Sequence, residues 1–172
     1  MIPARPKYTS EVFLLFFALI IASGLYLHVD NLPSTPDPDG LQHLSFDLVI
    51  YDAFHRFKEF PLWNPYFGGG IPWTGYFQHP GISLQSIFPI IFGEVVGLKI
   101  RLLCYLFFGA LFMNQFFLKW MKLPPGAALF GSCLYLSSPW FVGKILDGNY
   151  SEIGYFIFPA YIMLFVAILK RK

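Results

Sequence analysis

The sequence predicts an all-α integral membrane protein with about four transmembrane helices and a long extracytoplasmic first loop that contains an amphipathic interfacial helix. Composition is the first observation: 56% of the 172 residues are hydrophobic and only 13% are charged. Soluble domains carry charge on roughly a quarter of their residues. The second observation is a set of long windows without charge, and the third is an acidic, proline-rich segment between the first two windows. Together they predict one membrane domain over residues 1–172.

The charge-free windows set the predicted spans, because a helix needs about 17 to 25 apolar residues to cross the hydrocarbon core. They cover about residues 12–29, 102–118, 123–143 and 153–169. The first window has an alternative interpretation, since basic residues before it and small residues near its end also suit a cleaved signal peptide. The run stays apolar beyond the expected cleavage point, which favours an uncleaved anchor.

The basic residues predict the orientation. With the N-terminus inside, the cytoplasmic flanks hold seven of the twelve Lys and Arg residues, which satisfies the positive-inside rule. Both termini are then cytoplasmic, and about residues 30–95 form an extracytoplasmic loop. Nine of the ten acidic residues lie in that loop or at the turn before the fourth span, and Glu11 is the exception.

Several classes of function have no support in the sequence. The net charge of +2 and the lack of a basic stripe argue against a nucleic-acid partner. Cys104 and Cys133 both lie inside apolar runs, where a thiol behaves as a small hydrophobic group. No phosphate-binding Walker loop, zinc spacing or nucleophile elbow is present.

An amphipathic helix is predicted within the outer loop. Apolar residues recur with helical spacing at positions 46, 49, 50, 53, 54 and 57, and charged residues occupy the opposite side. The stretch before it, STPDPDGLQH, contains Asp37 and Asp39. Asp39 with Gln42 three residues later matches the capping-box spacing, so Asp39 fits either a helix cap or a functional carboxylate. Asp37 lies outside that cap and fits either a solvated loop residue or a site residue.

The stretch after this helix is predicted to be irregular. It has no charge between Glu59 and Glu94 but carries five prolines and a run of three glycines, which break helices. Irregular backbone at membrane depth must be covered by protein or line a wet cavity. His79 lies in this aromatic stretch and is open to two interpretations, a structural hydrogen-bonding residue or a ligand-binding one.

At these residues the chain resembles a known group of membrane enzymes. An aspartate shortly before Gln-His, an amphipathic helix and then PLWNPYFGGGIP are similar to the first outer loop of GT-C-type polytopic glycosyltransferases, especially the YfhO-like membrane proteins. The tail from LYLSSPWFVG to FPAYIMLFVAIL is similar to the next helix pair of that group. Asn149 follows Gly148 at the outer turn, where a histidine is more familiar. The family usually has eight or more spans, so the resemblance implies an N-terminal portion of such a protein, a split gene product or a shortened relative.

The resemblance implies roles for particular residues. An acidic residue of the first outer loop serves as general base in this group, which implies Asp39 as the catalytic residue and Asp37 as its neighbouring candidate. Gln42 and His43 are candidates for binding the acceptor or a metal, and His79 is a further substrate-binding candidate. The donor phosphate needs cations, for which the outward-side candidates are Arg56, Lys99, Arg101 and Lys144. Each of these cations also fits a lipid headgroup contact.

The resemblance also implies the surroundings of the reaction. The donor would be a sugar on a polyprenyl phosphate, at the outer face of the plasma (inner) membrane of a prokaryote. The expected partners are the lipid bilayer and a further chain that completes the helix bundle. A divalent cation is the candidate cofactor, because the acidic residue is a metal ligand in some branches of the group.

Two other functions remain open at this point. The chain fits a non-catalytic membrane scaffold or accessory subunit that keeps the GT-C-like fold without its chemistry. It also fits a transporter fragment, but transport sites are built from ionisable residues inside the membrane, and the four predicted spans contain none.

The predicted topology has a direct test. In a variant without Cys104 and Cys133, single cysteines placed at Ser34, Thr74 and Ser151 are expected to react with a membrane-impermeant thiol reagent in intact cells. Labelling of all three only after lysis would contradict the orientation.

Overall fold

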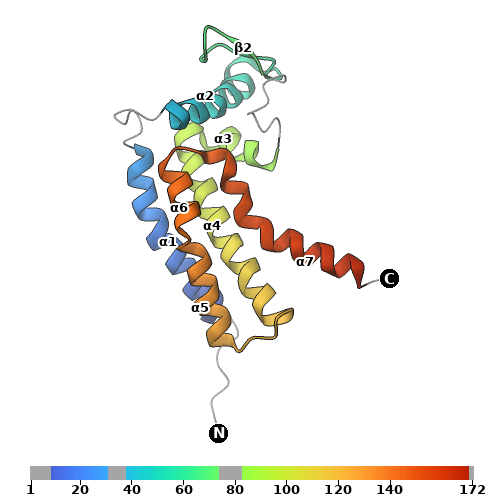
Figure 1. The fold of residues 1–172 in the computed structure, drawn as a ribbon. Helices are drawn as coiled ribbons and strands as arrows, with labels where there is room; N and C mark the ends of the chain where they lie inside the picture. Colours follow the sequence, from blue (N-terminus) through green and yellow to red (C-terminus); the bar gives the residue numbers. More distant parts are fainter. Residues whose placement is uncertain (1–8, 31–37, 74–82, 171–172) are drawn as a thin grey trace. The chain divides into compact units, whose positions relative to one another are not determined.

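The computed structural model describes residues 9–30, 38–73 and 83–170, and most of them are helical (Figure 1). The all-α prediction is confirmed. The chain divides into two compact units, which are described one at a time. The helix unit comprises Met1–Gly24, Leu103–Val142 and Gly154–Lys172, and the loop unit comprises Leu25–Leu102 and Gly143–Ile153. A single membrane domain over the whole chain stays a prediction.

The helix unit is formed by long apolar helices. It contains most of α1 (Thr9–Asp30) and α4 (Glu94–Lys119), all of α5 (Pro125–Leu136) and α7 (Phe158–Leu169), and the start of α6 (Pro139–Leu146). Leu14, Ala18 and Ala22 form a fully buried face of α1 with a spacing of four residues. Small residues at such faces let helices approach closely, and a β-carbon on Gly131 of α5 would lie 2.6 Å from the Phe117 ring of α4.

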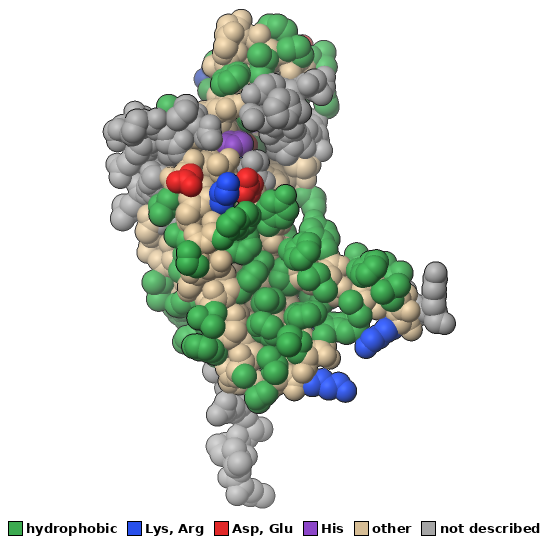
Figure 2. All heavy atoms as spheres, in the orientation of Figure 1, with side chains coloured by type: hydrophobic (Ala, Val, Ile, Leu, Met, Phe, Trp, Pro, Cys, Tyr) green, Lys and Arg blue, Asp and Glu red, His purple; other side chains and the backbone are tan. Residues whose placement is uncertain are grey.

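Two helices are long and apolar enough to cross a membrane by length and composition, Glu94–Lys119 and Glu152–Leu169. They overlap the second and fourth predicted spans. The second of them is mostly exposed, and Figure 1 shows α7 leading away from α4 and α5. Hydrophobic side chains are spread over the visible surface of the helix unit in Figure 2. Apolar surface of this extent suits lipid or another helix rather than water.

The third predicted span was wrong as a single helix. Residues 123–143 form two helices, because α5 ends at Leu136 and α6 begins at Pro139. Proline has no N–H to continue the hydrogen-bond ladder and disfavours helical backbone in the residue before it. The Ser137 hydroxyl also donates to the Cys133 carbonyl at 2.9 Å, which satisfies a carbonyl of the last turn of α5.

The bounds of the second and fourth spans also differ from the prediction. Helix α4 begins at Glu94, before the window at 102–118, and continues through Arg101 because that guanidinium is paired within the loop unit. The fourth segment begins as a 3₁₀ helix, Tyr150–Ile157, before α7. Pro159 offers no N–H to the Tyr155 carbonyl, which accepts instead from the Tyr135 hydroxyl at 3.2 Å.

The loop unit contains the predicted amphipathic helix. Helix α2 spans Pro38–Asp52 and passes into a π-helical turn at Ala53–Phe57. Next come the strands β1 (Trp63–Asn64) and β2 (Ile71–Pro72), a 3₁₀ turn at Leu84–Ser86 and α3 (Ile87–Phe92). Proline is favoured at a first helical position, so Pro38 explains why α2 begins earlier than the apolar stripe.

The core of the loop unit confirms most of the predicted stripe. Phe46, Val49 and Ile50 of α2 pack with Trp73, and Ile71 and Ile90 pack against this cluster. The prediction was wrong at the end of the stripe, because Phe54 is 37% exposed and Phe57 is 62% exposed. The wider π turn rotates both side chains away from the core face, which periodicity of 3.6 residues does not anticipate.

The irregular backbone predicted after α2 is present, apart from a small hairpin and α3. Strands β1 and β2 are antiparallel, with Trp63 opposite Pro72 and Asn64 opposite Ile71. Gly68, Gly69 and Gly70 all have positive φ, a conformation that other residues rarely adopt. The Trp63 indole lies directly over Gly70, where a β-carbon would approach the ring to 2.5 Å.

One close approach in the helix unit gives a stability prediction. A β-carbon at Gly109 of α4 would lie 2.5 Å from the Phe156 carbonyl oxygen, which is backbone and cannot rotate away. Gly109→Ala is therefore expected to lower the free energy of unfolding by about 1 to 3 kcal/mol. The matched control is Gly126→Ala in α5, where nothing lies within 4 Å. Thermal unfolding in detergent, followed by circular dichroism, measures both; equal melting temperatures would contradict the close contact.

Candidate functional site

The first turns of α2 carry the predicted site residues. Asp39, predicted as the cap, is instead the second residue of the helix, which begins at Pro38, and its side chain lies outside the described residues. Asp37 and His79 lie wholly outside them. Acidic groups in a first turn are stabilised by the positive end of the helix dipole, which keeps a carboxylate ionised. The roles predicted for these three residues stay predictions.

His43 connects α2 to the turn that follows α6. Its ring meets the Phe46 ring edge-on, with 5.9 Å between centroids, and the Tyr150 ring, with 6.1 Å between centroids. Tyr150 is only 1% exposed, so this contact is internal to the loop unit. Segments more than a hundred residues apart in the sequence therefore meet at a predicted substrate-binding residue.

Lys144, a predicted phosphate ligand, lies in the last turn of α6, just before this turn. Its Nζ lies 3.4 Å from Glu152 Oε1, and both side chains are about one-third exposed. Gly148, with φ of 76°, reverses the chain, and the Asn149 N–H donates to the Lys144 carbonyl at 2.9 Å. The turn therefore brings Lys144 and Tyr150 into the unit that contains Gln42 and His43.

A buried ion pair joins α2 to the first turns of α4. Arg101 Nη1 and Nη2 donate to Asp47 Oδ1 and Oδ2 at 3.2 and 2.9 Å, and both side chains are less than a tenth exposed. Burial raises the pKa of the Asp47 carboxyl, and the charge and hydrogen bonds of Arg101 act against that effect. Since both terminal nitrogens are used in this pair, Arg101 holds α2 against the first turns of α4 within the loop unit.

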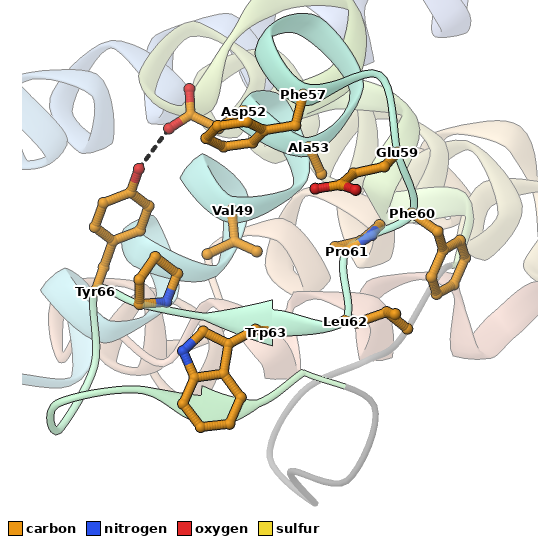
Figure 3. A pocket seen from close by; sticks show the side chains of 11 residues that line it. Val49, Asp52, Ala53, Phe57, Glu59, Phe60, Pro61, Leu62, Trp63 and Tyr66 are labelled. Carbon is orange, nitrogen blue, oxygen red and sulfur yellow. Dashed lines mark hydrogen bonds between the residues drawn. The ribbon is translucent and has the colours of Figure 1, made fainter.

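At the other end of α2, Asp52 interacts with two polar side chains, Tyr66 and Arg56. The Tyr66 hydroxyl donates to Asp52 Oδ2 at 2.6 Å (Figure 3), and this bond raises the pKa of the Tyr66 hydroxyl. Arg56 Nε lies 3.0 Å from Asp52 Oδ1, but the angle is not that of a hydrogen bond. Asp39 and Asp52 are 13 residues apart on one helix, so about 20 Å of helix separates the two ends.

A metal site is not formed by the side chains that the structure describes. None of their histidines, cysteines and carboxylates come together in a group of three or more. The predicted divalent cation would need Asp37 or Asp39, whose side chains lie outside that set, so it stays a prediction.

Sequence reasoning missed Asp47, Asp52 and Tyr66 as interacting residues. Helical spacing places Asp47 and Asp52 opposite the apolar stripe and gives no partner for either. A signal was present in Arg101, a cation with an apolar residue on each side in a long helix, because buried charges are paired. Nothing in the local sequence indicated which carboxylate would pair with it.

The chain was compared with known proteins in three ways. No family model matches it, and neither a curated protein nor a solved structure matches it. The resemblance to GT-C-type glycosyltransferases therefore depends on the quoted motifs and stays a prediction.

The buried pair predicts a double-mutant result. Removing one partner of a buried ion pair leaves an uncompensated charge and costs about 3 to 5 kcal/mol, whereas apolar replacement of both is close to neutral. Arg101→Met alone is therefore expected to destabilise the chain strongly, and Asp47→Leu with Arg101→Met to recover most of the loss. Chemical denaturation in detergent measures the free energies.

A less buried pair supplies the control for this cycle. Lys144→Met breaks the contact with Glu152 and is expected to cost less than about 1 kcal/mol, because solvent screens partly exposed charges. If Arg101→Met costs no more than Lys144→Met, the buried pair does not stabilise the loop unit.

Proposed function

We propose that the chain is the N-terminal part of a GT-C-type membrane glycosyltransferase of the YfhO-like group. It transfers a sugar from a polyprenyl-phosphate-linked donor to an acceptor at the extracytoplasmic face. The observation that carries this proposal is the loop unit: α2 begins at Pro38 and Asp39, followed by Gln42 and His43, and is fixed to α4 by the Asp47–Arg101 pair. An outer-loop carboxylate on a fixed helix is what the reaction needs.

Asp39 acts as the general base in this proposal. Proton transfer from an acceptor hydroxyl to a positioned carboxylate contributes about 10² to 10⁴ in rate. The helix N-terminus favours the ionised form, which is the form that accepts a proton. Asp37 is the neighbouring candidate. Gln42 and His43 bind the acceptor, and the contact between His43 and Tyr150 supports a fixed orientation for the imidazole.

The proposal places the chain in the plasma membrane with four spans and both termini in the cytoplasm. The length and apolar character of Glu94–Lys119 and Glu152–Leu169 support two of the spans. The continuous helix α1 supports the first. The third span is the broken pair α5 and α6, and broken helices within membranes occur where they line a protein-covered or wet cavity. A further chain completes the bundle.

One observation favours a second candidate, a non-catalytic scaffold with the same fold. Three of the predicted phosphate ligands are engaged by acids of this chain: Arg101 by Asp47, Lys144 by Glu152 and Arg56 by Asp52. A donor phosphate that binds Lys144 or Arg56 would have to displace an acid, and Arg101 is buried. A scaffold requires no such exchange.

The role of Asp39 separates these two candidates. Asn is nearly the same size as Asp and is also accepted at a helix start, so Asp39→Asn is expected to cost at most about 1 kcal/mol of stability. Because Asn cannot take a proton, transfer of sugar from a polyprenyl-phosphate donor is expected to fall at least about 10²-fold. The assay uses the full chain together with the chain that completes it.

Two further variants complete this test. Asp37→Asn is the neighbouring control and is expected to leave transfer largely intact if Asp39 is the base. Asp39→Ala loses both the helix-start interaction and the base. If Asp39→Asn keeps full transfer while Asp39→Ala loses folded protein, the residue is structural and the catalytic assignment is wrong.

A further inference from the structure

A cavity lies at the C-terminal end of α2, about 20 Å of helix away from Asp39. Its volume is about 240 Å³, and it is enclosed by the end of α2, the π turn and the chain around β1 (Figure 3). Its lining combines the carboxylates of Asp52 and Glu59 with the aromatic rings of Phe57, Phe60, Trp63 and Tyr66. The residues predicted for sugar transfer do not include these carboxylates, so the cavity is distinct from that site.

The carboxylates give the cavity a negative lining. Asp52 is 2% exposed, and its Oδ1 is buried without a hydrogen bond, although Arg56 Nε lies 3.0 Å away. Arg56 itself is 68% exposed and does not line the cavity. Glu59 is held at the rim by its backbone N–H, which donates to the Ala53 carbonyl at 3.0 Å. In Figure 3 its carboxylate points toward Ala53 and Val49.

The aromatic rings form the open side of the cavity. Phe57, Phe60, Trp63 and Tyr66 are each about half exposed or more, so their surfaces are accessible. Two of the rings are held in place: the Tyr66 hydroxyl by Asp52, and the Trp63 indole by its seat over Gly70. A fixed ring loses little conformational freedom when a ligand binds, which favours affinity.

The chemistry of this lining selects the charge of the ligand. Among the described lining residues there is no Lys, Arg or His, and the nearby cation, Arg56, is paired with Asp52 from outside the lining, so an anion would meet the unpaired carboxylate of Glu59. A neutral sugar would need hydrogen-bond donors as well as acceptors. The lining residues offer few side-chain donors, because the Tyr66 hydroxyl already donates to Asp52 and the Trp63 N–H is the other one. A cation gains from the carboxylates and from the negative faces of the rings.

We propose that this cavity binds a small organic ammonium group, with Glu59 facing the charge, the Trp63 and Tyr66 rings in contact with its apolar surface, and Asp52 holding the Tyr66 ring in place. The volume lies below the roughly 300 to 1,000 Å³ of cavities for drug-sized molecules, so the ligand is small or inserts only its headgroup. The proposal does not rest on the proposed sugar transfer.

Choline and 3,3-dimethylbutan-1-ol, which replaces its nitrogen by carbon, form a matched pair of probes. They have almost the same shape and differ in charge. Titration of the full chain in a non-ionic detergent, measured by calorimetry, is expected to give a dissociation constant for choline at least about tenfold lower than for the neutral alcohol. Equal affinities would show that the cavity is merely apolar, and the proposal would be wrong.

Variants connect the binding to this cavity. Glu59→Gln and Trp63→Leu are each expected to weaken choline binding about tenfold, because each removes one attractive group at an exposed position. The matched controls are Asp147→Asn, another exposed acid of the loop unit, and Trp140→Leu, a similarly exposed tryptophan of α6. Circular dichroism confirms that each variant folds. Unchanged affinity in both cavity variants would assign binding elsewhere and overturn the proposal.

Two further titrations fix the ligand class and its source. Glucose binding without choline binding would mean a sugar site and would also overturn the proposal. When the chain is held in nanodiscs of phosphatidylcholine rather than phosphatidylglycerol, weaker binding of free choline identifies the lipid headgroup as the occupant. Equal binding in both identifies a free ammonium compound, and either result supports an ammonium site.

Discussion

The buried ion pair between Asp47 and Arg101 determines how the loop unit is built. Each charge would be costly alone in an apolar core, and together they join α2 to the first turns of α4 through two parallel hydrogen bonds. Because the pair is bidentate, it fixes the rotation of α2 as well as its position. This rotation in turn directs Phe46, Val49 and Ile50 onto Trp73, so the core contacts lie in the middle of the helix and not at its ends.

Those two ends differ in charge and surroundings. The first turns carry the positive end of the helix dipole, with His43 against Tyr150 and the paired Lys144 in the same unit. The last turn carries Asp52 and borders a cavity that is also lined by Glu59 and several exposed aromatic rings. One helix therefore carries residues of the proposed transfer site in its first turns and borders an acidic, aromatic cavity at its last turn. Because the two ends of α2 are far apart, a substitution at one end can be made without changing the residues at the other.

Much of this arrangement was predictable from spacing, and the remainder depended on contacts distant in sequence. The apolar stripe from Phe46 to Ala53 followed from helical periodicity, and the irregular stretch after it followed from its prolines and glycines. Pro139 was a visible sign of a helix break, but the absence of charge over residues 123–143 led to the prediction of one continuous span. The pairing of Arg101 with Asp47 brings together residues 54 positions apart, which no local pattern encodes. The carboxylate of Asp39, on which the predicted chemistry depends, lies outside the described side chains.

The π turn at Ala53–Phe57 has a consequence for how this chain tolerates change. A π turn holds one residue more than the α-helical turn that would fill the same length, so the loss of a single residue here would restore the α-helical register. Phe57 would then rotate by about 100° toward the core face, given 3.6 residues per turn. The hollow beside Asp52 would fill with the chain's own side chain. The length of this turn, more than the identity of any residue in it, keeps that space open.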